Sequence, residues 1–133
     1  MKDLIWDESL SVDIQEVDED HRKLVALFNM LNHSVADGDA ANYIEAVMEE
    51  LITCTVWHFR HEERLMLKHN YKGLEDHKKE HQELVDSAKE LQQKLVLEGK
   101  SVSDKDIVFL EHWLVGHILG ADMEMASYLG EVM

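Results

Sequence analysis

The stretch that decides the fold is Leu74–Leu95, LEDHKKEHQELVDSAKELQQKL. Its apolar residues and its two histidines recur at alternating steps of three and four positions: Leu74, His77, His81, Leu84, Ala88, Leu91 and Leu95. Residues with this spacing form one continuous stripe along an α-helix. His77 and His81 therefore occupy core positions near the start of the predicted helix, and the charged residues Lys78–Glu80 between them face solvent.

Three other segments carry a stripe of the same kind, and each contains a histidine. The stripes are Val17, His21, Leu24, Phe28 and Leu31 in the first segment; Ile44, Val47, Leu51, Cys54, His58, Glu62 and Leu65 in the second; and Ile107, Leu110, Leu114, His117 and Ala121 in the fourth. We expect this last helix over Asp104–Leu129, with Ser103 or Asp104 as its N-cap. The chain has no proline, and Gly38, Gly73 and Gly99 mark the breaks between the segments.

Short connections between four long helices favour an all-α, antiparallel up-down-up-down four-helix bundle. The 133 residues suffice for one domain that buries a core without disulfides. We expect a single domain over residues 1–133, with an N-terminal arm over residues 1–17 and the bundle over residues 18–133.

In this topology the polar positions of the four stripes meet in one layer, because the start of the first and third helices lies beside the end of the second and fourth. The layer consists of His21, His58, Glu62, His77, His81 and His117. Buried polar groups without partners are costly, and metal ions would satisfy these. Five imidazoles and a carboxylate exceed the four ligands of one zinc ion and indicate two ions. Imidazole and carboxylate ligands suit iron, although they do not separate it from manganese.

The chain resembles the hemerythrin family, specifically single-domain bacterial hemerythrins, and the resemblance extends over nearly its whole length. The matching motifs are DEDHRKL at 18–24, HFRHEE at 58–63, HKKEH at 77–81 and WLVGHILGAD at 113–122, with IWDESLSV at 5–12 resembling the arm of the family. One departure is Asp13, where the family usually has glycine. Aspartate tolerates the left-handed backbone better than most residues.

The resemblance implies two iron ions joined by an oxo or hydroxo bridge. Its metal ligands would be His21, His58, Glu62, His77, His81, His117 and Asp122. Glu62 and Asp122 would bridge the irons, three histidines would complete one iron, and His21 and His58 would leave the other with an open position for dioxygen. Only the resemblance assigns Asp122, because it is turned about 140° from His117 on an ideal helix. A local unwinding near Gly120, or a side chain that reaches across, would bring it in.

The resemblance also indicates an apolar dioxygen pocket formed by Leu24, Phe59, Trp113 and Ile118, which as core residues would equally be expected to pack. Glu63 is expected to orient one of the ligands by a hydrogen bond. His61 matches no ligand of the family and is expected at the surface or behind a ligand. Gly116 and Gly120 interrupt the fourth helix, for which either close helix packing or room for a ligand path would be the reason.

Composition argues against several partners. The net charge of −15 would repel nucleic acid and anionic membrane surfaces. No apolar run approaches the length of a membrane span, and the acidic start MKDLIWDESL is unlike a signal peptide. A single cysteine, Cys54, cannot form an internal disulfide and favours a reducing compartment. We therefore expect a cytoplasmic protein.

The function that we expect is reversible dioxygen binding for oxygen carriage, storage or scavenging, by an oxygen-binding protein rather than an enzyme. One alternative is a di-iron enzyme, a peroxidase or oxidase or a scavenger of nitric oxide. Another is an oxygen sensor, which ordinarily needs an output domain for which this chain leaves no room. A metal-free bundle for protein contacts is the remaining alternative. The sequence does not identify a protein that would receive the oxygen.

Overall fold

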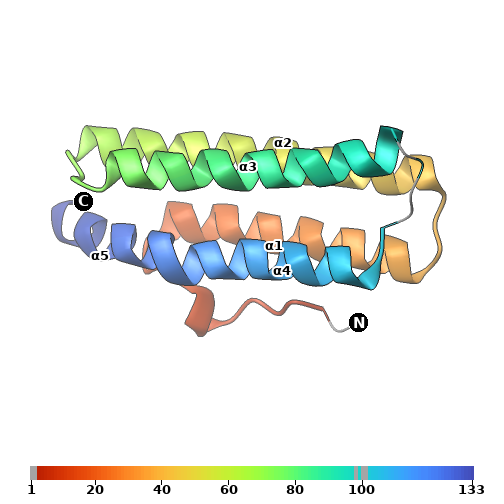
Figure 1. Ribbon diagram of the computed structural model, residues 1–133. Coiled ribbons are helices and arrows are strands. Elements are labelled where there is room, and N and C mark those ends of the chain that lie inside the picture. The colour runs from red at the N-terminus through yellow and green to blue at the C-terminus, as the bar shows by residue number, and fades with distance from the viewer. Residues whose placement is uncertain (1–2, 98, 100–101) are drawn as a thin grey trace.

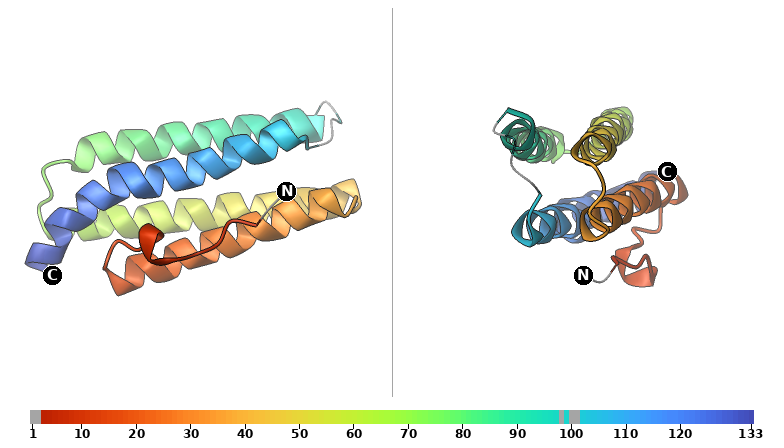
Figure 2. Two further views of the ribbon diagram at one scale, coloured as in Figure 1. Left: turned by 90° about the horizontal axis from the view of Figure 1, so that it is seen from below. Right: turned by 90° about the vertical axis from the view of Figure 1, so that its right-hand side faces the viewer.

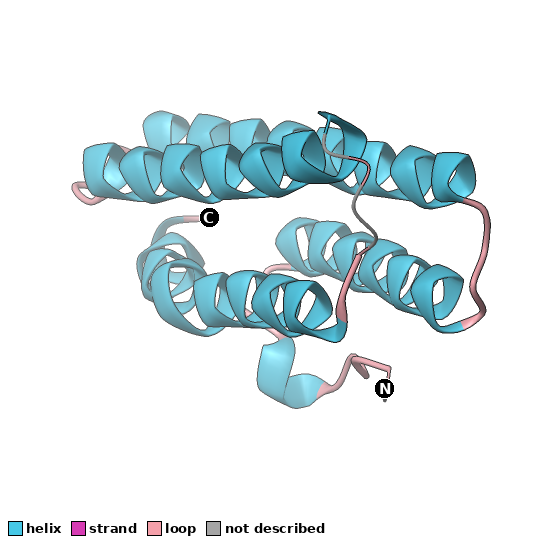
Figure 3. Ribbon diagram, turned by 45° about the vertical axis from the view of Figure 1, so that its right-hand side comes forward, coloured by secondary structure: helices cyan, strands magenta, loops and turns pink. Residues whose placement is uncertain are grey.

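Helices form almost the whole of the computed structural model, which describes residues 3–97, 99 and 102–133. Figure 3 draws helices and loops, and the described residues contain no strand. In chain order the elements are the 3₁₀ turn η1 (Glu8–Leu10), α1 (Gln15–Ala36), α2 (Ala41–Lys68), α3 (Leu74–Leu97), α4 (Asp104–His117), the π-helical segment η2 (Ile118–Asp122) and α5 (Met123–Val132). The last three follow one another without a loop and together form the predicted fourth helix.

The helices form the predicted antiparallel four-helix bundle. Helix α1 packs against α2, α2 against α3, α3 against α4, and α4 against α1. The end-on view in Figure 2 has these four helices at the corners of a square. The expected all-α up-down-up-down topology is thereby confirmed.

The ends of the helices follow from local chemistry. Ser103 caps α4 through a capping box, in which its side chain accepts from the Asp106 backbone and its own N–H donates to the Asp106 carboxylate. Gly38 ends the first helix with φ of +68°, a left-handed conformation that glycine adopts without strain. No helix in the described part of the chain is long and apolar enough to cross a membrane.

The N-terminal arm lies along α1, as Figure 1 shows. The Leu4 backbone pairs with the Asn29 side chain at 2.8 Å through both its N–H and its carbonyl. Nearer the bundle, the Asp18 carboxylate accepts from the Val12 N–H at 2.8 Å. Asp13 has φ of 59°, a left-handed conformation that aspartate tolerates better than most residues. Helix α1 begins at Gln15, three residues before the expected start of the bundle.

The interior consists of two apolar clusters with a polar layer between them. The larger cluster, which extends from the layer toward the α1–α2 connection, includes Leu24, Phe28, Leu31, Leu51, Ile107 and Leu114. The smaller cluster, at the α2–α3 connection and the arm, includes Val12, Val17, Met66, Met125 and Leu129. The polar layer is therefore closed off by apolar side chains at both ends.

Candidate metal centre

The polar layer brings together all seven side chains that the sequence analysis singled out as metal ligands. They are His21 on α1, His58 and Glu62 on α2, His77 and His81 on α3, His117 on α4 and Asp122 in η2. None is more than 5% exposed. Because His58 and Glu62, and likewise His77 and His81, are four residues apart, each pair lies on one side of its helix.

Asp122 reaches this layer because the backbone changes its winding after His117. In η2 the N–H of Met123 donates to the carbonyl of Ile118, which is the five-residue bond of a π-helix. One turn thus contains an additional residue, so that Asp122 lies beside His117, with 2.9 Å between Oδ1 and Nε2. The unwinding expected near Gly120 is observed.

The seven side chains form two overlapping groups that share both carboxylates. One group contains three histidines, His77, His81 and His117, with Glu62 and Asp122. The other contains His21 and His58 with the same two carboxylates. Within each group the ligand atoms all lie within 4.8 Å of one another. Both carboxylates would therefore contact two ions if each group held one.

Each carboxylate turns one oxygen toward each group. Asp122 Oδ1 lies 3.0 Å from His77 Nε2, and Oδ2 lies 2.9 Å from His21 Nε2. In the same way, Glu62 Oε1 lies 3.0 Å from His81 Nε2, and Oε2 lies 3.0 Å from His58 Nε2. This is the arrangement of two bridging carboxylates, as seen between paired metal ions.

The inward-facing nitrogen and oxygen atoms of the layer fit a metal site better than a set of side chains that hydrogen-bond to one another. Seven side-chain atoms are buried without a hydrogen-bond partner: His21 Nδ1 and six atoms within the two groups, namely His21 Nε2, His58 Nε2, His77 Nε2, Glu62 Oε2 and both oxygens of Asp122. The Nε2 nitrogens among them lie within 3.0 Å of a carboxylate oxygen, yet the geometry is not that of a hydrogen bond. Buried polar atoms are rarely left in this way. Metal ions at the two groups would satisfy all six.

Three outer carboxylates orient the histidines from behind. The Nδ1–H groups of His58, His81 and His117 donate to Asp20, Glu63 and Glu80 at 2.8, 2.8 and 2.9 Å respectively. A carboxylate only accepts, so each of these imidazoles turns its Nε2 toward the layer. Sequence analysis expected such a role for Glu63 without saying for which ligand.

Asp20 and Glu80 were missed, although each directly precedes a ligand, His21 or His81, in the sequence. Each of them bonds a histidine of a different helix, so adjacency in sequence did not indicate the partner. His61 also lies behind a ligand, because its Nδ1 donates at 2.6 Å to the Asp20 oxygen that His58 uses. His61 is half-buried, and its side chain is 17% exposed.

The layer also shifts the pKa values of its own groups. Burial alone would lower the pKa of His58, but the nearby charge of Glu62 and the hydrogen bond to Asp20 raise it to about 10. Burial is likewise outweighed by the close carboxylates of Asp122 and Glu62 at His77 and His117, where the pKa rises to about 9 and about 11. The same contacts lower the pKa of Asp122 to about 2, against the opposing effects of burial and of Glu62. Protons and metal ions therefore compete for this layer.

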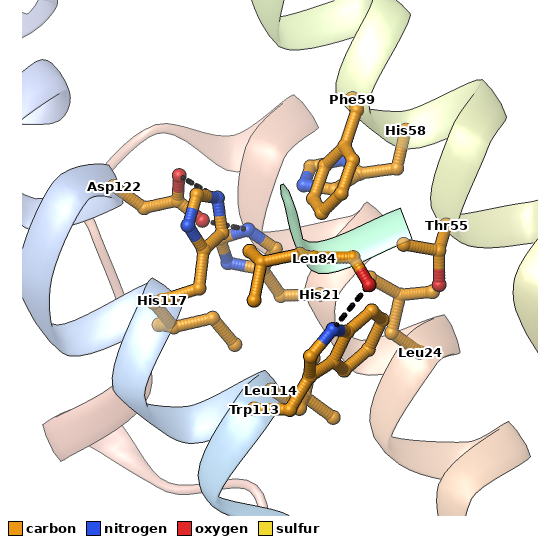
Figure 4. Close-up of a pocket in the computed structure, with 11 residues that line it drawn as sticks. His21, Leu24, Thr55, His58, Phe59, Leu84, Trp113, Leu114, His117 and Asp122 are labelled. Carbon is orange, nitrogen blue, oxygen red and sulfur yellow. Dashed lines mark hydrogen bonds and ion pairs between the residues drawn. The ribbon is translucent and has the colours of Figure 1, made fainter. Parts of the chain in front are cut away.

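A small cavity borders the two-histidine group, as Figure 4 shows. Its lining consists of His21, Leu24, Thr55, His58, Phe59, Leu84, Trp113, Leu114, His117, Ile118 and Asp122. All four residues expected in the dioxygen pocket are among them, and Thr55, Leu84 and Leu114 were not anticipated. The space open to the centre of a water-sized molecule is about 10 Å³, which is room for about one such molecule.

Comparison with known proteins identifies a family for this chain. Residues 12–129 match the Hemerythrin HHE cation binding domain, so the chain belongs to the hemerythrin family. A "Hemerythrin-like protein" of Naegleria gruberi is 36% identical over 93% of this chain and 92% of that protein. A "Bacteriohemerythrin" of Pseudomonas aeruginosa is 33% identical over 99% of this chain and 83% of that protein. A crystal structure of wild-type hemerythrin superposes with a TM-score of 0.87 at 28% identity and covers 95% of this chain and 97% of that one.

Proposed function

We propose that this chain binds dioxygen reversibly at a di-iron centre and so carries, stores or scavenges oxygen. In this proposal His77, His81 and His117 would hold one iron ion, His21 and His58 would hold the other, and Glu62 and Asp122 would serve both ions. A ferrous pair held there would supply the electrons for binding dioxygen. Membership of the hemerythrin family and the two carboxylates common to both groups support this assignment. A cytoplasmic location, in keeping with the lone Cys54, is part of the proposal.

The observation that carries the proposal is the wall of the small cavity. Thr55 is a hydroxyl donor in that wall, and it already donates at 2.7 Å to the Leu51 carbonyl of its own helix. The indole N–H of Trp113 is likewise taken, at 2.8 Å, by the Leu84 carbonyl. Apart from the proposed ligands, the other lining residues are apolar. Reduction of dioxygen to hydrogen peroxide or water needs protons, and this wall has no side chain free to donate them.

The size of the cavity points the same way. A space of about 10 Å³ admits a diatomic molecule and excludes an organic substrate unless side chains rearrange. This supports a carrier over an oxidase or peroxidase that acts on an organic substrate. The alternatives are an enzyme, which includes a scavenger of nitric oxide, and an oxygen sensor. The absorption experiment described next tests the carrier function against the enzyme.

Visible absorption of the iron-loaded protein tests the proposal. We expect a colour that appears when anaerobic protein is exposed to air, fades under vacuum and returns over repeated cycles. Thr55→Val should leave this cycle intact, because the Thr55 hydroxyl already donates to the Leu51 carbonyl of its own helix and is not needed to hold dioxygen. A colour that does not fade on deoxygenation, or rapid turnover that depends on an added substrate, would contradict the carrier function and favour an enzyme.

A further inference from the structure

His61 is the histidine of the HFRHEE motif that the proposed ligand set does not include. It lies on α2 next to Glu62. Its ring lies 5.8 Å from the Trp57 ring, centroid to centroid, and its Nε2 lies 3.6 Å from Glu16 Oε1. The other ring nitrogen, Nδ1, donates to Asp20. His61 is therefore held with Nδ1 toward the metal centre and Nε2 toward the surface.

Two imidazoles donate to one oxygen atom of Asp20. His58 Nδ1 donates to Asp20 Oδ2 at 2.8 Å, and His61 Nδ1 donates to the same oxygen at 2.6 Å. The shorter bond is the one from His61, which is not a proposed ligand. Because both N–H groups draw on the same negative charge, each receives a weaker hydrogen bond than it would receive alone. His61 therefore weakens the hydrogen bond between Asp20 and His58.

The three-histidine group has a different arrangement of outer carboxylates. His81 donates to Glu63, and His117 donates to Glu80, so each of these ligands has a carboxylate of its own. A carboxylate that accepts from a ligating imidazole raises the basicity of that imidazole and hence the electron density that it gives to the metal ion. An ion in this group would therefore receive full support from two outer carboxylates.

The two-histidine group receives less support. His58 shares its carboxylate with His61, and His21 Nδ1 has no hydrogen-bond partner in the described part of the chain. Asp20 is the least exposed of the three outer carboxylates, at 15% against 26% and 42%, so water screens its charge least. Undivided, that charge would act strongly on His58. An ion in this group would thus be the poorer in electrons because His61 takes part of it.

We propose that His61 raises the reduction potential of the metal centre by sharing the charge of Asp20 with His58. In the di-iron centre of the proposed function, on which this inference rests, a ligand that gives less electron density favours ferrous over ferric iron. His61 touches neither ion and is a positioning residue. Irreversible loss of the ferrous state takes one electron from each iron to dioxygen, which leaves with two protons from water as hydrogen peroxide. A higher potential makes this loss less favourable, as repeated oxygen binding requires.

The reduction potential of the iron-loaded protein, measured anaerobically by titration with redox mediators, checks this role. His61→Leu removes the competing donor, and we expect a lower potential. Oxidation of the ferrous variant in air should be about threefold to tenfold faster, the effect of one hydrogen bond on a rate. His61→Asn should restore the wild-type potential, because its amide donates to Asp20 in place of Nδ1. His33→Leu is the matched control, since it removes another histidine–carboxylate pair, with Asp3 at 2.6 Å, in the last turn of α1.

Asp20→Asn separates an effect of charge from an effect of shape. Its amide oxygen still accepts from His58 but carries no charge, so we expect the potential to rise, opposite to the change in His61→Leu. A general loosening of the contact between α1 and α2 would shift both variants in the same direction. Equal potentials of the wild type and His61→Leu, or shifts of the same sign in the two variants, would overturn the proposal. The potential is measured without dioxygen, so its result is independent of whether the centre proves to be a carrier or an enzyme.

Discussion

Glu62 and Asp122 are the residues on which the centre depends, because both belong to both groups of histidines. Their four oxygens lie 2.9 to 3.0 Å from imidazole nitrogens of different helices. Sequence periodicity indicated Glu62, which lies on the same stripe as His58. It did not indicate Asp122, because that position points away from the core on a regular helix, and only the family resemblance assigned it.

Glu62→Gln should therefore reduce the metal content from two ions per chain to one or fewer at equimolar loading. The amide keeps the shape of the side chain but removes the charge that bridges two cations. Metal analysis after gel filtration measures the stoichiometry, and circular dichroism verifies that the variant is folded. Glu131→Gln, an exposed change of the same kind near the C-terminus, is the control. Two tightly bound ions in Glu62→Gln would show that this carboxylate is not a bridge.

Glu80 illustrates how an outer carboxylate supports a ligand on another helix. Its Oε1 accepts from His117 Nδ1 at 2.9 Å, so Glu80→Ala leaves that imidazole without an orienting partner. We expect about a tenfold to hundredfold loss of iron affinity, the usual effect of removing such a partner. Competition with a chelator measures the affinity, and Lys79→Ala is the neighbouring control. Equal affinities of the two variants would exclude a role for Glu80.

At the scale of the element, η2 is the segment whose side-chain directions a regular α-helix does not predict. All five histidines in the layer lie in regular α-helix, so their positions followed from counting residues. The fourth helix contains one residue more in the turn after His117, and this insertion has no signal in hydrophobic spacing apart from the nearby Gly120. The contacts of Asp20 and Glu80 were missed for a related reason, since they depend on the distance between helices.

Deletion of Leu119 tests the interpretation of η2 as a one-residue insertion. A π turn contains one residue more than an α turn, so the deletion should restore a regular helix with Asp122 four residues after His117. Asp122 and the apolar residues of α5 would keep their side of the helix, and we expect two metal ions per chain to be retained. An alanine inserted after Gly120 is the converse variant and should lose metal, because it turns Asp122 away by about 100°. Loss of metal from a folded deletion variant would contradict this interpretation.

At the scale of the whole molecule, the bundle followed from the sequence because four periodic segments with short connections have few ways to bury their stripes. The path of the arm did not follow, since it depends on individual hydrogen bonds such as those between Leu4 and Asn29. The position of the polar layer along the bundle followed from the antiparallel order of the helices, which brings the polar parts of the four stripes to one level. That layer also determines how the stability of the whole chain depends on pH.

Chelator-treated protein should be most stable between about pH 4.5 and 6.5. The pKa values of His58, His77 and His117 rise from 6.5 to about 10, 9 and 11 in the fold, so the stability that they contribute is complete below pH 6.5 and is lost as the pH rises through 9 to 11. The pKa of Asp122 falls from 3.8 to about 2, and that of Glu62 falls below 4.5, so their contribution is lost as the pH falls toward 2.

Thermal unfolding of the chelator-treated protein from pH 3 to pH 11 measures this dependence. The iron-loaded protein is the comparison, because metal ions take the place of the protons and should move the optimum toward higher pH. A melting temperature that rises from pH 6.5 to pH 10 in the metal-free protein would contradict the assignment.

The two apolar clusters on either side of the polar layer have a consequence for how this protein acquires its metal. The larger one connects all four helices without using any residue of the layer, and the smaller one ties the arm to the other end. We therefore expect this chain to fold without metal, unlike a zinc finger, and to be loaded afterwards as a folded apoprotein. The same folded chain would serve as a host into which manganese or cobalt is introduced in place of iron, so that the metal can be varied while the surrounding protein is held constant.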